Sequence, residues 1–180
     1  PARPAHVITS STATANVLAE KMPGASVYVI GEEGLYDALE EKGLRIVKKD
    51  ADAVVIGIDR TITYEKLARA CLELQNGAHF YSTNSDAAVP TERGLLPGNG
   101  SLTAVLTTAT GRKPTFVGKP EAVIIEQALE VLNTDKERTL MVGDNYDTDI
   151  LAGIRAGLDT LLVHTGVPTK QGLKQYDIQP

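Results

Sequence analysis

Apolar and polar residues alternate along this chain in two patterns, one typical of strands and one typical of helices. Short β-branched runs that end near glycine predict strands at 25–31, 51–58, 78–82, 114–118, 139–143 and 159–164, and a further strand-like run stands at 6–9. Apolar residues spaced three and four apart, with turn residues at the ends, predict helices at 33–42, 63–76, 101–110 and 147–156. A further helix is predicted with Pro120 in its first turn and an apolar face that extends to Leu132. Because strands and helices follow each other in turn, the pattern predicts an α/β fold with parallel sheets and helices on their faces.

Two features interrupt this pattern and suggest how the chain is organised. Residues 83–100 are rich in Asn, Asp, Pro and Gly, which predicts a long irregular segment of the kind that is usually functional or disordered. The strands after Gly111 are more continuously apolar than those before it, as in a central parallel sheet, so we place a domain boundary there. Neither Pro1 nor Pro180 resembles a natural terminus, and we expect these residues to be the middle of something longer.

Composition narrows the class of protein. The 180 residues are 42% hydrophobic and 23% charged, as expected of a folded soluble protein, and the net charge is -5. That charge argues against nucleic acid or an anionic membrane as the main partner, while a small anionic substrate stays compatible with it. The chain lacks the apolar run of ~20 residues that spans a bilayer, and it opens without a signal-peptide pattern, so we expect a cytoplasmic location. The single cysteine, Cys71, lies at a helical core spacing and is expected to pack inertly.

Two side chains that could carry chemistry follow strand-terminal glycines. Lys119 comes after Gly118 and Asp144 after Gly143, and ligands of open α/β sheets bind outside the carboxyl ends of the strands. If the two strands are neighbours, Asp144 could hold Mg²⁺ and Lys119 could neutralise a phosphoryl group in one crevice. The alternatives are purely structural roles. Asp144 would then only cap the helix after it, and Asp149 would only stabilise the first turn of that helix through the helix dipole.

Lys119 follows one predicted strand, a helix comes next, and Asp144 and Asp149 follow the next strand. This order of motifs points to a particular protein family. Segments 116–120 and 143–153 look like the third and fourth motifs of haloacid-dehalogenase (HAD) superfamily phosphatases. The cap domain of the NagD-like, or 4-nitrophenylphosphatase, branch is similar to residues 83–86, Pro90, Gly94 and 97–101. The point where the chain of that branch enters its cap resembles residues 9–11 and 13–15. The resemblance covers essentially all 180 residues.

The resemblance implies a Rossmann-like parallel-sheet core, formed here by residues 1–9 and 112–180, with an inserted α/β cap at 10–111. It implies a Mg²⁺-dependent phosphatase of small phosphate monoesters, such as sugar phosphates and 4-nitrophenyl phosphate, that works through an aspartyl-phosphate intermediate. The site residues and their implied roles are Lys119 on the phosphoryl oxygens, Asp144 on Mg²⁺, Asp149 orienting Lys119 or metal-bound water, and Asn145, Tyr146, Asp147 and Thr148 against the substrate.

The chain also departs from the family pattern. The Asp-x-Asp-Gly-Thr strand end that supplies the family's nucleophile is missing, and we expect it before Pro1, with Thr9–Ser11 as a possible remnant of the second motif. The core is therefore incomplete within these residues, and we expect them alone to show little or no turnover. The nearest look-alike of the nucleophile motif, Gly57–Thr61, has a single aspartate, Asp59, inside the cap, where a strand-to-helix turn is the expected role.

The remaining expectations concern alternatives and partners. The rival hypothesis is a non-catalytic α/β module that binds a phosphorylated metabolite in the same crevice. His6 and His79 are expected to be partly buried and His164 to lie near the site, and no His and Cys cluster suggests zinc. Val89 stands before Pro90 where relatives specialised for pyridoxal phosphate have a histidine, which disfavours that substrate. The sequence leaves the oligomeric state open, with a cap-mediated homodimer as one option.

Overall fold

The structure is a computed structural model that describes residues 3–165, 173 and 176–180. The chain divides into two compact units, one formed by Thr9–Gly118 and the other by Pro1–Ile8 together with Lys119–Pro180. Both units are built from parallel strands and helices, so the predicted α/β fold is confirmed. None of the helices in the described part of the chain has the length and apolar run that a membrane crossing requires.

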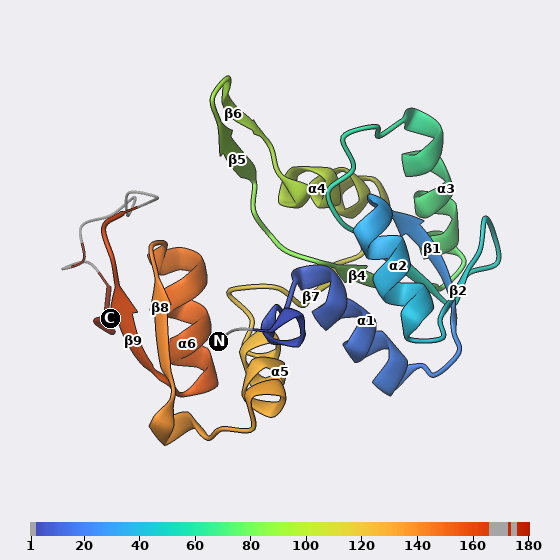
Figure 1. Cartoon of the computed structure of the whole chain (residues 1–180). Helices are drawn as coiled ribbons and strands as arrows, with labels where there is room; N and C mark the ends of the chain where they lie inside the picture. Colours follow the sequence, from blue (N-terminus) through green and yellow to red (C-terminus); the bar gives the residue numbers. More distant parts are fainter. Residues whose placement is uncertain (1–2, 166–172, 174–175) are drawn as a thin grey trace. The chain divides into compact units, whose positions relative to one another are not determined.

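The Thr9–Gly118 unit is built on a five-stranded parallel sheet with the strand order β2-β1-β3-β4-β7 (Figure 1). Its strands are β1 (Ser26–Ile30), β2 (Arg45–Ile46), β3 (Ala53–Ile56), β4 (His79–Ser82) and β7 (Thr115–Phe116). The register aligns Val29 with Val55 and Val55 with Tyr81 across the three central strands. All four residues of β3 are buried, as is typical of a central parallel strand that is covered on both faces.

Four helices cover this sheet: α1 (Ser10–Lys21), α2 (Glu33–Glu41), α3 (Tyr64–Gln75) and α4 (Asn99–Thr110). One apolar core lies between the sheet and the α3–α4 side, and its fully or nearly buried members are Ile30, Val54, Ile56, Ala70, Leu74, Ala78, Phe80 and Leu106. Successive strand residues point to opposite faces, so Val27 and Val29 are buried on the other face, where Figure 1 places α1 and α2. The side chains of Thr9 and Thr63 cap α1 and α3 by accepting a backbone N–H.

A hairpin replaces the irregular segment expected at 83–100. Strands β5 (Ala88–Thr91) and β6 (Gly94–Pro97) pair antiparallel, and in Figure 1 they project from the rest of their unit. The prediction was wrong because Pro90 and Pro97, residues that usually argue against a strand, lie inside an isolated two-stranded ribbon whose outer edges need no partner. Gly94 takes φ +109° just after the connection, a conformation that favours glycine.

Other parts of the structure also differ from the sequence pattern. The strand-like run at 6–9 is not a strand: a 3-10 helix at Pro4–His6 ends at its first residue, and no strand follows in the described part of the chain before β1. The short strand β2 and the helix α1 were not predicted. Strand β7, expected in the core sheet, pairs with β4, and it belongs to the compact unit that ends at Gly118. That the first unit acts as a cap stays a prediction.

The second unit contains a strand–helix–strand crossover. Its elements after Lys119 are α5 (Val123–Leu132), a 3-10 turn at Lys136–Arg138, β8 (Leu140–Gly143), a π-helical turn at Tyr146–Ile150, α6 (Leu151–Ala156) and β9 (Asp159–Leu162). Strands β8 and β9 pair in parallel, and α6 connects them (Figure 1). Apolar side chains on these strands stay about half exposed, namely Leu140, Val142 and Leu161. This unit therefore carries an apolar sheet face that its described residues do not cover.

Candidate active site

An ion pair between Lys119 and Asp149 forms the centre of the candidate site. The Nζ atom of Lys119 lies 2.6 Å from Oδ1 of Asp149. The Asp149 side chain is 9% exposed and that of Lys119 is 44% exposed. An ammonium group has three donors, so Lys119 can hold Asp149 and still donate to an anion on its solvent side. The strand before Lys119, β7, pairs with β4, and the strand before Asp144, β8, pairs with β9.

The second oxygen of Asp149 binds the loop that follows β8. Its Oδ2 atom accepts from the backbone N–H groups of Asp144, at 3.3 Å, and Asn145, at 3.2 Å. One carboxylate therefore holds both the lysine and the loop that carries Asp144. Gly143 makes this possible, because a Cβ at that position would lie 2.1 Å from the Cβ of Asp149. The sequence pattern indicates only a strand end at Gly143 and gives no sign of this steric role.

Asp144 is the residue that could hold a metal ion. It is half-buried and follows directly after the last residue of β8. Mg²⁺ typically takes one or two carboxylates and fills its other positions with water and phosphate oxygens, so a single carboxylate at this position fits it. In the described residues no three His, Cys, Asp or Glu side chains gather as a metal cluster, and both oxygens of Asp149 already bind protein groups. Among the described residues Asp144 could thus contribute one carboxylate to a magnesium ion, and this role stays a prediction.

The loop from Asn145 to Thr148 was predicted to face the substrate. The Asn145 side chain accepts from the N–H of Asp147 at 3.0 Å, which closes a local turn. Asn145 and Thr148 are half-buried and Asp147 is exposed. Tyr146, in contrast, is only 4% exposed, and its hydroxyl donates to a backbone carbonyl of the carboxyl-terminal segment. Its ring faces protein in this structure, while the substrate role of the whole loop stays a prediction.

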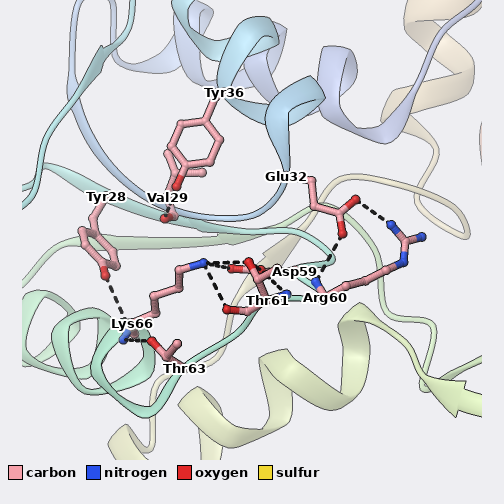
Figure 2. Close-up of polar contacts among 9 residues, drawn as sticks. All are labelled: Tyr28, Val29, Glu32, Tyr36, Asp59, Arg60, Thr61, Thr63 and Lys66. Atoms are coloured by element: carbon pink, nitrogen blue, oxygen red, sulfur yellow. Dashed lines mark hydrogen bonds and ion pairs between the residues drawn. The ribbon is translucent and has the colours of Figure 1, made fainter.

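The look-alike of the nucleophile motif is a tight polar turn in the other unit (Figure 2). Asp59 is 2% exposed and accepts from the N–H and hydroxyl of Thr61, at 2.8 and 2.9 Å, and from Nζ of Lys66 at 2.7 Å. Burial raises the pKa of the Asp59 carboxyl, but the hydrogen bonds from Lys66 and Thr61 outweigh burial, and the pKa lies below its ordinary value. Both oxygens are occupied by local donors, which fits the expected strand-to-helix turn.

The histidines and the cysteine add no further chemistry. His6 and His79 are exposed, so the expectation that they are partly buried was wrong. His6 is the last residue of its 3-10 helix and His79 is the first residue of β4. His164 is also exposed and comes just after β9. Cys71 is half-buried against the α3–α4 core, and burial raises the pKa of its thiol, which agrees with inert packing.

Comparison with known proteins identifies the family. A family model described as HAD-hydrolase-like matches residues 116–180, and one described as haloacid dehalogenase-like hydrolase matches residues 1–45. The chain is 63% identical over 171 residues to 5'-nucleotidase YutF of Bacillus subtilis, covering 95% of this chain and 67% of that protein. It is 52% identical over 181 residues to an acid sugar phosphatase of Staphylococcus aureus, covering 99% and 70%. The chain belongs to the haloacid dehalogenase-like hydrolases.

Solved structures of this HAD family agree with the fold and the branch. A double mutant of a thermostable NPPase from Geobacillus stearothermophilus superposes with a TM-score of 0.94 at 60% identity, over all of this chain and 71% of that one. Glycerol phosphate phosphatase Rv1692 from Mycobacterium tuberculosis, in complex with magnesium, gives 0.86 at 42% identity, over 90% of this chain and 50% of that one. These relatives are named as phosphatases, which favours a hydrolase over the rival hypothesis of a non-catalytic module. The predicted NagD-like resemblance is confirmed.

Proposed function

We propose that this HAD-family protein is a Mg²⁺-dependent phosphatase of small phosphate monoesters. One observation carries the proposal: Lys119 and Asp149 are held 2.6 Å apart, and Asp149 also binds the backbone of the loop that carries Asp144. This arrangement joins a cation for the phosphoryl oxygens to a carboxylate for the metal. The magnesium complex of Rv1692 and the phosphatase names of the relatives support the same chemistry.

Each residue has a definite part in this proposal. Lys119 binds and neutralises the phosphoryl group, and Asp149 fixes the direction of the lysine side chain. Asp144 contributes one carboxylate to Mg²⁺, which when bound supplies positive charge beside the phosphate. Asn145, Asp147 and Thr148 are assigned to the substrate side of the loop, whereas the ring of Tyr146 packs against protein.

The nucleophile in this proposal is an aspartate outside residues 1–180. A carboxylate nucleophile forms an aspartyl phosphate that water then hydrolyses, which splits one difficult displacement into two. A strand that carried this aspartate could cover the half-exposed apolar side chains of Leu140, Val142 and Leu161. On this view residues 1–180 alone have little or no turnover.

Substrate choice is assigned to the cap, which we place at residues 10–111. The proposed substrates are sugar phosphates and 4-nitrophenyl phosphate, and the similarity to YutF adds nucleoside 5'-monophosphates as a class to test. Four further points stay predictions. They are a small phosphorylated metabolite as partner, the lack of nucleic-acid and membrane partners, a possible homodimer and a cytoplasmic location.

The test is hydrolysis of phosphate monoesters by the full-length gene product. We expect 4-nitrophenyl phosphate to be hydrolysed with Mg²⁺ and not with excess chelator. Lys119→Ala and Asp144→Asn should each lower kcat/KM by a factor on the order of 100 or more. Matched controls are Lys113→Ala and Asp159→Asn, which make the same charge changes at exposed positions, Asp159 at the opposite end of the β8–β9 pair.

The controls should keep the parent activity. The proposal fails if the full-length protein hydrolyses none of 4-nitrophenyl phosphate, a hexose phosphate, glycerol phosphate and a nucleoside 5'-monophosphate with Mg²⁺. It also fails if Lys119→Ala and Asp144→Asn retain the activity of their matched controls.

A further inference from the structure

The carboxyl-terminal residues 176–178 bind the loop between Asp144 and Asp149. The ring of Tyr176 stacks on the ring of Tyr146, with centroids 3.6 Å apart and an interplanar angle of 27°. The hydroxyl of Tyr176 donates to Oδ1 of Asp147 at 3.0 Å. In the opposite direction, the hydroxyl of Tyr146 donates to the carbonyl of Ile178. Two consecutive loop residues are thus held by a segment that comes much later in the chain.

The loop that is held in this way has an unusual backbone. Residues Tyr146–Ile150 form a π-helical turn, in which the N–H of Ile150 reaches the carbonyl of Asn145 at 3.3 Å. Isolated π turns are rare in proteins and occur often at functional sites. A π turn contains one residue more than an α turn, so a shift to α-helical geometry would rotate Asp149 away from its present direction. That direction brings Asp149 to Lys119 and to the amides of Asp144 and Asn145.

We infer that Tyr176 is a positioning residue, which through Tyr146 and Asp147 keeps the loop in the π turn that aligns Asp144 and Asp149. The inference rests on the proposed function for its catalytic consequence. Tyr146 is almost fully buried in this arrangement, and the two hydroxyl contacts fix the loop on both sides of the stacked rings. Tyr176 therefore acts on the metal-binding and lysine-binding carboxylates through the loop that carries them.

The state of the Tyr176 hydroxyl agrees with this role. Loss of solvation raises the pKa of the Tyr176 hydroxyl, and the hydrogen bond to Asp147 raises it further. The Tyr176 hydroxyl is therefore available as a donor to Asp147 at neutral pH.

Two variants of the full-length protein test the inference. Tyr176→Phe removes the hydroxyl and keeps the ring, and Tyr176→Leu removes both. The control is Tyr64→Phe, at an 85% exposed tyrosine in the other unit. The first measurement is amide hydrogen exchange of the segment 144–150, which needs no activity. We expect exchange to be about threefold to tenfold faster in Tyr176→Phe, faster again in Tyr176→Leu, and unchanged in the control.

The second measurement separates positioning from general stability. The Mg²⁺ concentration that gives half-maximal hydrolysis of 4-nitrophenyl phosphate should rise about threefold to tenfold in Tyr176→Leu, at a temperature where the variant is fully folded, and less in Tyr176→Phe. Near-ultraviolet circular dichroism should lose the tyrosine–tyrosine signal of the stacked pair in both variants, while only Tyr176→Phe keeps a stacked ring.

The outcomes are distinct. Unchanged exchange in segment 144–150 in both Tyr176 variants overturns the inference, whatever the activity. An unchanged Mg²⁺ requirement in an active Tyr176→Leu variant overturns it as well. If the parent protein is inert with every monoester, the proposed function fails, and the exchange result alone then decides whether Tyr176 holds the loop.

Discussion

Replacing Gly143 with alanine should damage the candidate site without changing any charged group. The new Cβ would lie 2.1 Å from Cβ, 2.6 Å from Cγ and 2.8 Å from Oδ2 of Asp149. Carbon atoms in contact stay about 3.5 Å apart, so the added methyl group and Asp149 must separate by more than about 1 Å. Because the new methyl group is fixed to the backbone of a paired β-strand, Asp149 is the group that moves.

The cost of that movement follows from the contacts of Asp149. A shift of more than about 1 Å takes the 2.6 Å contact with Lys119 beyond hydrogen-bonding distance and loosens the contacts with the two loop amides. A hydrogen bond between charged groups contributes about 1.5–3 kcal/mol, and the 44% exposure of Lys119 reduces this through solvent screening. We therefore expect the free energy of unfolding to fall by about 2 kcal/mol, with strain included.

Two assays on the full-length protein measure the effect. Urea unfolding should give the loss in stability, and kinetics with 4-nitrophenyl phosphate should give a kcat/KM lower by roughly a hundredfold, as expected for a misplacement of catalytic groups by about 1 Å. Gly34→Ala is the matched control, since nothing lies within 4 Å of its added Cβ. Because Gly34 is in α2, alanine should stabilise the control by up to about 0.5 kcal/mol.

The steric reasoning would be refuted by a Gly143→Ala protein that unfolds at the same urea concentration as the parent and keeps its kcat/KM. The double variant with Lys119→Ala tests the route through Asp149. If Gly143→Ala acts by breaking the contact with Lys119, the two changes together should cost clearly less stability than the sum of their separate effects.

Two further predictions concern the Thr9–Gly118 unit. Because the folded-state pKa of Asp59 is lowered, its contribution is present above its unfolded pKa of about 4 and is lost as pH falls through the folded value. Asp59→Asn should therefore lower the free energy of unfolding by about 1–3 kcal/mol at pH 7, as measured by urea unfolding, with a smaller difference from the parent at about pH 3. Equal differences at the two pH values would contradict the pairing with Lys66. Thr63→Ala removes the side-chain cap of α3 and should cost about 1 kcal/mol in the same assay, whereas a change below about 0.3 kcal/mol would show that water replaces the cap.

The regular elements of the fold could be predicted because local patterns determine them. Strands β1, β3, β4, β8 and β9 and helices α2, α3 and α5 lie within a few residues of the predicted ranges. Their apolar spacing and terminal glycines are local signals. The hairpin β5–β6 could not be predicted in this way, because its pairing depends on contacts across a turn and its prolines hide the strand pattern.

The candidate site was predictable in its residue types and less so in its contacts. The contact between Lys119 and Asp149 is the arrangement that the family resemblance implies, while the roles of both residues stay predictions. The contacts of Tyr176 with Tyr146 and Asp147 could not be predicted, because these residues come much earlier in the chain and the sequence around Tyr176 has no pattern that indicates the contacts. Such long-range packing depends on the path of the whole chain, and the π turn at Tyr146–Ile150 likewise has no simple local pattern.

Gly118 and Gly143, which precede Lys119 and Asp144, have a steric role besides ending their strands. From the sequence, a shared crevice depended on neighbouring strands, and in the structure β7 pairs with β4 while β8 pairs with β9. At both glycines the backbone lies very close to another segment of the chain. A Cβ on Gly118 would lie 2.3 Å from the carbonyl oxygen of Thr83, and a Cβ on Gly143 would overlap with the side chain of Asp149. Each glycine that precedes a proposed functional side chain stands where the chain passes another segment too closely for any side chain. The Gly-Lys and Gly-Asp pairs therefore specify a geometry as well as a chemistry, because the residue before each charged group allows the approach that the site requires.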